Sequence, residues 1–219
     1  AFDYARAKHE TRVNDHGARF DGPGLSLGLA ASVPLRQDGD GAVGTFTLGE
    51  GESATFILRD IARDATPGQC PGTDEAEDRF RETIAFWQKW LSKCTYHGRW
   101  RETVHRSALA LKLLTYEPTG AIVAAPTTSL PEGIGGVRNW DYRYCWLRDA
   151  AFTLYAFLRI GFTDEATKFM DWLAARWKER ESTGDGPLQL MYAVDGNPHL
   201  DEYELPHLDG YMGSRPVRV

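Results

Sequence analysis

The sequence has few cysteines and no long apolar run. Its three cysteines are Cys70, Cys94 and Cys145, and no pair of them has the C-x-x-C spacing. An odd number without that spacing indicates neither a disulfide framework nor a zinc site, so we expect no metal, no cofactor and a cytoplasmic, reducing setting. No apolar stretch approaches the ~18 residues of a membrane span, and the N-terminus lacks the charged-then-apolar order of a signal peptide. We therefore expect no membrane association.

The sequence also lacks a block of basic residues. It carries 25 Lys and Arg against 31 Asp and Glu, a net charge of −6, and both signs are spread along the chain. Without a basic block that could neutralise phosphates, nucleic acid is not expected as a partner. Tryptophan is plentiful by contrast, because five of the seven fall between Trp87 and Trp146. A tryptophan either fills a core or offers a flat face to a ligand such as a sugar ring, and the composition leaves both open.

Residues 1–66 are rich in glycine and alternate apolar with polar side chains over short stretches. The clearest stretches are 25–29, 43–48 and 53–58, and Asp38-Gly39-Asp40-Gly41 has the composition of a hairpin turn. Period-two alternation broken by such turns predicts antiparallel strands with one buried face. Because these few strands cannot close a sandwich by themselves, we expect this region to be the end of an antiparallel β-sandwich whose other strands lie upstream.

The pattern changes to helical spacing after a linker rich in proline and glycine at 66–72. We expect helices at about 73–92 with Thr73 as N-cap, at 101–115, from Asp149 to a Gly161 C-cap, and at 164–178. The third is apolar on nearly every side and should be buried all round. The fourth should carry one apolar stripe formed by Ala166, Phe169, Met170, Leu173 and Trp177. A fully buried helix alternating with a half-buried one is typical of a two-layer helical barrel.

Residues 116–148 form a connection too long and too aromatic to be a plain loop, and they end in the charged pair Arg148-Asp149 before the most apolar helix. Asp149 as an N-cap and Arg148 paired with another carboxylate would be a purely structural explanation. Alternatively, Arg148 donates and Asp149 accepts hydrogen bonds with sugar hydroxyls while Tyr142 and Trp146 offer ring faces. The spacing alone leaves both readings open.

Long stretches of the sequence resemble glycoside hydrolase family 15 in its bacterial form. The stretches that carry the resemblance are 100–109, 124–150, 188–192, 204–205 and 213–218. The resemblance implies an N-terminal β-sandwich at 1–66, a linker and linker helix at 67–98, and the first helices of an incomplete (α/α)6 catalytic barrel at 99–219. It also implies that Arg148 and Asp149 hold a terminal glucose, that Tyr142 and Trp146 line the same subsite, and that Arg215 closes its far side.

Members of this family invert the anomeric carbon with a glutamic acid and a glutamate base. The resemblance implies that both lie downstream of Val219, so we expect no catalytic residue within this chain and no activity of the chain alone. Glu132, Glu202 and Glu204 are the local glutamates, and Glu204 lacks the Trp-Glu context of the acid, so we interpret it as structural.

Three functions remain open at this point. The first is part of an inverting α-glucoside hydrolase, glucoamylase-like or trehalase-like, acting on an oligosaccharide or a disaccharide. The second is a non-catalytic carbohydrate-binding or regulatory fragment, and the third is a phosphorylase of the same barrel architecture. The sequence determines neither which α-glucoside is the substrate nor the oligomeric state.

Overall fold

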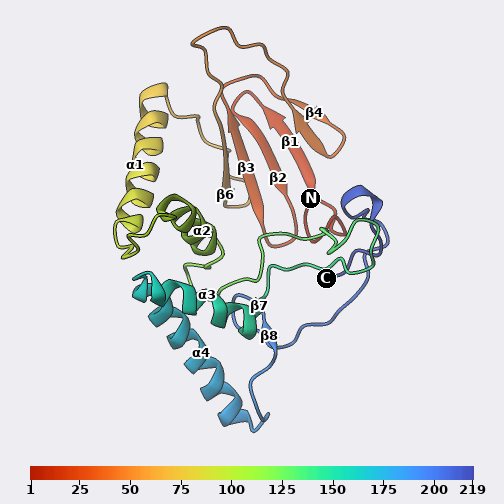
Figure 1. The fold of residues 1–219 in the computed structure, drawn as a ribbon. Helices are drawn as coiled ribbons and strands as arrows, with labels where there is room; N and C mark the ends of the chain where they lie inside the picture. Colours follow the sequence, from red (N-terminus) through yellow and green to blue (C-terminus); the bar gives the residue numbers. More distant parts are fainter. The chain divides into compact units, whose positions relative to one another are not determined.

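The computed structural model describes all residues, 1–219, which form two compact units, Ala1–Phe86 and Trp87–Val219. Strands predominate in the first unit and helices in the second (Figure 1). Helices are too few to show a closed barrel. The elements in chain order are β1 (Glu10–Asn14), β2 (Gly17–Asp21), β3 (Ser26–Ala31), β4 (Arg36–Asp38), β5 (Gly41–Val43), β6 (Phe56–Ile61), α1 (Thr73–Leu91), α2 (Arg101–Leu113), β7 (Cys145–Trp146), α3 (Leu147–Arg159), α4 (Thr163–Thr183), β8 (Met191–Tyr192) and the 3-10 turn Tyr211–Gly213.

The first unit is built on an antiparallel sheet with strand order β1-β2-β3-β6. Burial alternates along β3, whose Ser26, Gly28 and Ala30 face the covered side, as the period of a strand requires. The predicted strand at 25–29 is therefore confirmed, but its buried face is not the apolar one, because Leu27 and Leu29 are only half-buried and Leu25 is 40% exposed. The predicted hairpin turn is confirmed as well, because Asp38 pairs with Gly41 across a two-residue turn between β4 and β5.

Two other strand predictions need correction. The alternating stretch at 43–48 is not a strand beyond Val43; its Phe46 packs instead on the ring of Phe56, with centroids 5.6 Å apart. The stretch at 53–58 enters β6 only at Phe56. The β1–β2 hairpin was not predicted, because charged pairs such as Arg12 opposite Arg19 mask the apolar alternation there.

The second unit has a helical core around the end of α1. The Trp90 ring stacks on Phe162 with centroids 3.9 Å apart and an interplanar angle of 5°, and Phe157 meets both rings edge-on. Glu165 is only 4% exposed, and its Oε1 accepts a hydrogen bond of 2.7 Å from Trp90 Nε1 and lies 3.1 Å from Lys112 Nζ. Burial by itself raises the pKa of Glu165, but the two donors outweigh it and hold the pKa below its ordinary value. This carboxylate joins α1, α2 and α4.

A second core cluster joins α3, α4 and the β7–β8 pair. Trp172 meets the ring of Tyr192 edge-on, with centroids 5.7 Å apart. Because β8 pairs with β7, this cluster fixes the residues just before α3 against α4. Its buried members are Ala121, Ile122, Cys145, Ala150, Leu154, Ala166, Phe169, Trp172 and Tyr192.

Helix α3 begins two residues earlier than predicted. Its first residue is Leu147 and its N-cap is Trp146, without a side-chain cap. Asp149 therefore lies in the first turn, and the structural alternative that makes Asp149 an N-cap is wrong. The end of α3 is as predicted. Gly161 follows with φ +94°, and a Cβ there would approach Lys93 O to 2.9 Å, so only glycine fits.

One face of α3 is exposed, contrary to the prediction of burial on all sides. Phe152, Tyr155 and Leu158 are 72%, 64% and 54% exposed because no part of residues 1–219 covers them. Trp90, Phe169 and the rest of both clusters cover only the opposite face.

The other helices match their predictions with shifts at the ends. Helix α1 begins at Thr73, but Ala76 N–H donates to the carbonyl of Gly72, which moves the cap from Thr73 to Gly72. Helix α2 ends two residues early, and α4 runs on to Thr183.

The buried stripe of α4 is rotated relative to the prediction. Ala166 and Phe169 are buried as expected, but Met170 and Trp177 are each 53% exposed, and Trp172 is buried in their place. The reason is that buried Glu165 belongs to the core, which turns the contact face toward it.

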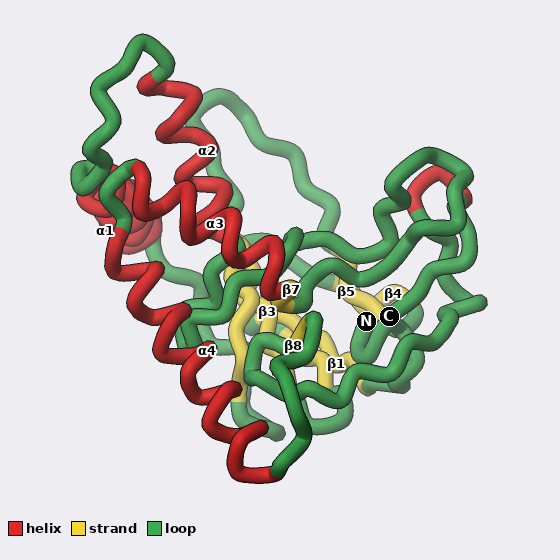
Figure 2. The backbone as a smooth tube through the Cα atoms, turned by 60° about the horizontal axis from the view of Figure 1, so that its bottom comes forward, coloured by secondary structure: helices red, strands yellow, loops and turns green.

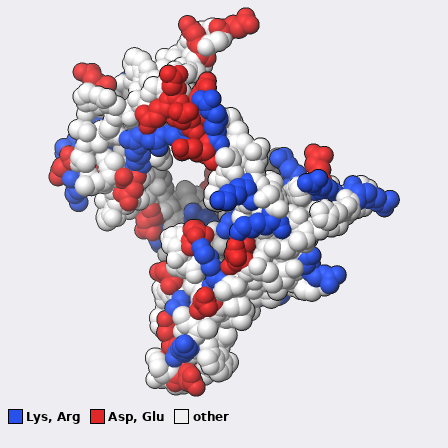
Figure 3. All heavy atoms as spheres, turned by 90° about the vertical axis from the view of Figure 1, so that its left-hand side faces the viewer, with Lys and Arg blue, Asp and Glu red and all other residues white.

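None of the helices is both long enough and apolar enough to cross a membrane. Acidic and basic side chains are intermingled on the face that Figure 3 presents. Most of the chain after α4 is loop (Figure 2), and these loops contribute to the site described next.

Candidate functional site

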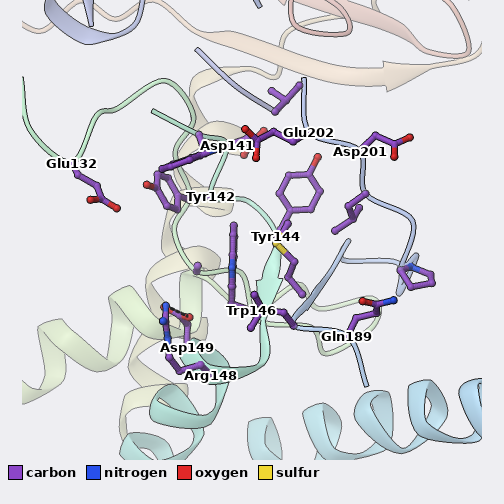
Figure 4. A pocket seen from close by; sticks show the side chains of 17 residues that line it. Glu132, Asp141, Tyr142, Tyr144, Trp146, Arg148, Asp149, Gln189, Asp201 and Glu202 are labelled. Atoms are coloured by element: carbon purple, nitrogen blue, oxygen red, sulfur yellow. Dashed lines mark hydrogen bonds and ion pairs between the residues drawn. The ribbon is translucent and has the colours of Figure 1, made fainter. Parts of the chain in front are cut away.

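A pocket of about 520 Å³ lies in the second unit, between the connection that leads into α3 and the loops that follow α4. Its volume falls in the range of ~300–1,000 Å³ that is usual for small-molecule sites. Figure 4 shows carboxylates and aromatic rings around it. The aromatic and polar side chains that line it are Glu132, Trp140, Asp141, Tyr142, Tyr144, Trp146, Arg148, Asp149, Gln189, Asp201 and Glu202.

The aromatic wall follows from an extended backbone before α3. Ala124 N–H donates to Tyr144 O at 2.9 Å and Ala125 N–H donates to Tyr142 O at 3.1 Å, which holds this segment straight. Side chains alternate along an extended chain, so Tyr142, Tyr144 and Trp146 line the pocket while Cys145 between them is fully buried in the core.

The three rings lie against one another rather than independently. The ring centroids of Trp146 and Tyr142 are 6.0 Å apart, and the two planes are tilted by 35°. The ring centroids of Trp146 and Tyr144 are 6.4 Å apart, and these rings meet almost edge-on. Such contacts fix ring orientation and leave apolar faces toward the cavity. Burial raises the pKa of the Tyr142 phenol, and the nearby Glu132 carboxylate raises it further, so this hydroxyl stays protonated at neutral pH.

Arg148 and Asp149 lie in the first turn of α3 and line the pocket together. Arg148 Nη2 donates to Asp149 Oδ2 at 3.1 Å. The two side chains are 72% and 36% exposed, so the protein leaves part of the hydrogen-bonding capacity of both available to a ligand in the pocket that they line. The partner of Arg148 is therefore its own neighbour, and a carboxylate in the first turn also interacts favourably with the helix dipole.

A buried carboxylate anchors the segment that carries the rings. Asp141 is 3% exposed and accepts from the backbone N–H of Arg143 at 2.8 Å and from its Nη2 at 2.6 Å. The same residue lines the pocket, although its oxygens are engaged by Arg143. We attribute to Asp141 a role in positioning the segment.

The structure brings four of the five predicted site residues together. Arg148, Asp149, Tyr142 and Trp146 all line the pocket, whereas Arg215 does not and is paired with Asp209.

Of the glutamates considered from the sequence, Glu132 and Glu202 line the pocket and Glu204 does not. Sequence reasoning missed Trp140, Asp141, Tyr144, Gln189 and Asp201. The alternation of rings through 142, 144 and 146 was the available signal for Tyr144.

The cysteine next to the pocket is not placed for nucleophilic chemistry. The Cys145 thiol beneath it is fully buried, and this burial raises its pKa to about 11. A protonated, inaccessible thiol is a poor nucleophile. No group of three or more His, Cys, Asp or Glu side chains is placed to hold a metal ion. What the pocket offers is hydrogen bonding and ring faces, a combination suited to a neutral polyol.

Comparison with known proteins agrees with this class of site, that of carbohydrate-processing proteins. Residues 98–219 match the model of the family described as glycosyl hydrolases family 15, and the chain belongs to that family. The resemblance inferred from the sequence is thereby confirmed.

Three relatives illustrate the similarity. The chain is 40% identical over its whole length to a trehalase of Thermoplasma volcanium, of which it covers 34%, and 38% identical to a trehalase of Thermoplasma acidophilum, of which it covers 36%. It is 46% identical over 67% of its length to a trehalase of Mycobacterium tuberculosis, covering 22% of that protein. The chain thus spans about a third, or less, of the curated relatives it matches. No solved structure matches it significantly.

Proposed function

We propose that the enzyme carrying this chain hydrolyses the α-glucosidic bond of a disaccharide, as a trehalase does, and that the pocket holds one terminal glucose. The observation that supports this most directly is the Arg148–Asp149 pair on the wall of an aromatic-lined cavity. The names of the relatives favour trehalose over maltodextrin as the substrate.

The chemistry of a sugar ring supports this assignment. Each hydroxyl both donates and accepts, and Arg148 can only donate while the Asp149 carboxylate can only accept, so together they satisfy two neighbouring hydroxyls. The C–H faces of a pyranose are apolar and pack on rings such as Tyr142 and Trp146. Such contacts contribute to catalysis to the extent that they strengthen as the ring distorts in the transition state.

We assign the general acid and base of the inverting reaction to residues outside 1–219. The two glutamates in the pocket are poor candidates, because Glu132 pairs with Arg138 at 3.1 Å and Glu202 with Arg218 at 3.3 Å. A general acid of a glycosidase instead sits in surroundings that keep it protonated. The chain by itself is then expected to bind sugar without cleaving it.

We also propose that α3 is an inner helix of an (α/α)6 barrel. The exposed apolar side chains of Phe152, Tyr155 and Leu158 are what such a helix would turn toward further helices of the same ring. On this proposal residues 1–66 belong to a β-sandwich domain, 67–98 to a linker and 99–219 to the barrel. Arg215 keeps its proposed place at the far side of the subsite only if its loop moves when sugar binds.

The decisive experiment is product analysis with the full-length enzyme. We expect glucose to be released from trehalose in buffer without phosphate, and maltose to be a poorer substrate. Formation of glucose 1-phosphate only when phosphate is present would indicate a phosphorylase. Calorimetric binding of trehalose with no product in either buffer would indicate a non-catalytic binding protein.

A further inference from the structure

Arg218 joins three segments around the pocket. Its guanidinium donates to Val137 O at 2.7 Å and to Glu204 Oε1 at 3.2 Å, and its Nε lies 3.3 Å from Glu202 Oε1. The Arg218 side chain is only 20% exposed, whereas both glutamates are more than half exposed. A largely buried cation thus holds two surface carboxylates that approach it from one loop.

The backbone of Arg218 fixes the opposite segment. Its N–H donates to Asn139 O at 2.9 Å, and its carbonyl accepts from Asp141 N–H at 3.0 Å. Trp140 lies between these two bonds, and the guanidinium is 5.6 Å from the centre of its ring. This contact and the paired bonds hold the Trp140 ring in place at the pocket.

Glu202 lines the pocket away from Arg148 and Asp149, and Trp140 belongs to the same lining. Figure 4 shows Asp201 and Glu202 at one end of the cavity and Arg148 and Asp149 at the other, with the aromatic wall between them. A cavity of about 520 Å³ accommodates a ligand larger than one sugar ring.

We propose that Glu202, positioned by Arg218, contacts the second sugar of the disaccharide and so determines which leaving group the enzyme accepts. The inference rests on the proposed function, because it takes Arg148 and Asp149 to hold the first sugar. The carboxylate of Glu202 accepts hydrogen bonds from hydroxyls of the second ring, and Trp140 offers that ring an apolar face.

The charge at this end restricts the second sugar to a neutral one. Asp201 and Glu202 are both acidic, and the only cationic side chain that lines the pocket is Arg148, at the other end. A phosphate on the second ring would therefore meet like charge, because the nearby Arg218 is already engaged by Glu202 and Glu204. Trehalose should be accepted and its 6-phosphate rejected.

The chain offers a matched pair of variants to test this. Glu202→Ala and Glu204→Ala each remove one carboxylate partner of Arg218 from an exposed position, but only Glu202 lines the pocket. Both are assayed in the full-length enzyme on trehalose and on α-D-glucopyranosyl fluoride, a substrate that has the first sugar but no second one.

We expect Glu202→Ala to lower kcat/KM for trehalose by about tenfold to a hundredfold and to leave kcat/KM for the fluoride within about twofold. Glu204→Ala should leave both unchanged. Equal losses on both substrates, no loss on either, or the same pattern in Glu204→Ala would overturn the inference. A wild-type enzyme that hydrolyses the fluoride but no disaccharide would also overturn it. Failure of wild type on every substrate would refute the proposed function itself.

Discussion

Two clusters in the second unit are built from the same kinds of side chain but differ in what surrounds them. In one, Glu165 accepts from Trp90 and Lys112 and is 4% exposed. In the other, Asp149 accepts from Arg148 beside a wall of rings, and the arginine is 72% exposed. Each has a carboxylate, a cation and aromatic rings.

The difference lies in where the hydrogen bonds go. In the Glu165 cluster the donors bind a carboxylate inside the protein and join three helices, whereas the Arg148–Asp149 pair lines a cavity and is partly exposed. A buried polar group must be satisfied internally, and an exposed pair contributes little to stability. The first cluster should therefore govern folding and the second ligand binding, and mutations should separate the two.

The largest effect should come from Asp149→Ala. We expect kcat/KM for trehalose to fall by about 10²- to 10³-fold in the full-length enzyme, because the lost acceptor acts on a ring that is distorted in the transition state. The melting temperature should stay near that of wild type, since this pair is exposed. Normal turnover by Asp149→Ala would contradict the assignment of Asp149 to the glucose-binding site.

Glu165→Leu should reverse this pattern. The change leaves Trp90 Nε1 and the largely buried Lys112 ammonium without their shared acceptor, and we expect unfolding to become about 2–3 kcal/mol easier. Chemical denaturation measures this loss. The fraction that remains folded should keep its KM for trehalose. A raised KM without a loss of stability would contradict the assignment of this cluster to folding.

The contribution of Glu165 should also depend on pH in one direction. Its pKa is lower in the folded state than in the unfolded state, so the folded state favours the ionised carboxylate. The stabilisation is then present above the unfolded-state pKa and is lost as the pH falls through the folded-state pKa. The stability difference between wild type and Glu165→Gln should accordingly shrink on acidification, and a difference that grows would show that the sign is wrong.

Arg79→Ala should have the smallest effect. Arg79 pairs with Glu75 at 2.8 Å on α1, one turn apart, and both side chains are more than half exposed. Exposed pairs of this kind contribute at most about 0.5 kcal/mol, so neither the melting temperature nor kcat/KM should change measurably. A large loss in either would show that exposure alone does not separate the two classes of cluster.

Residues near α3 show how far the sequence predicts the site. The motif around Arg148-Asp149 identified the family, and the end of α3 at Gly161 followed from local chemistry. The helix end was predictable because it is set by the backbone conformation of Gly161 and by hydrogen bonds within a few residues, such as that from Phe162 N–H to Phe157 O.

Features that depend on distant contacts were not predictable from local patterns. The residues next to Asp149 are compatible with an N-cap at this position. The helix nevertheless begins at Leu147, because the pairing of Trp146 with Met191 holds the preceding residues extended. The rotated face of α4 depends on Glu165 reaching Trp90, 75 residues away. The contact of Arg218 with Glu202 likewise arises only when separate loops meet.

The central claim is that Arg148 and Asp149 bind one glucose unit in the aromatic-lined pocket. A crystal structure of the full-length enzyme with bound glucose tests it most directly. We expect both side chains to lie within about 3.2 Å of hydroxyls of one ring, with that ring against Trp146 and Tyr142. Glucose bound elsewhere, or in the pocket without contact to either side chain, would contradict the account.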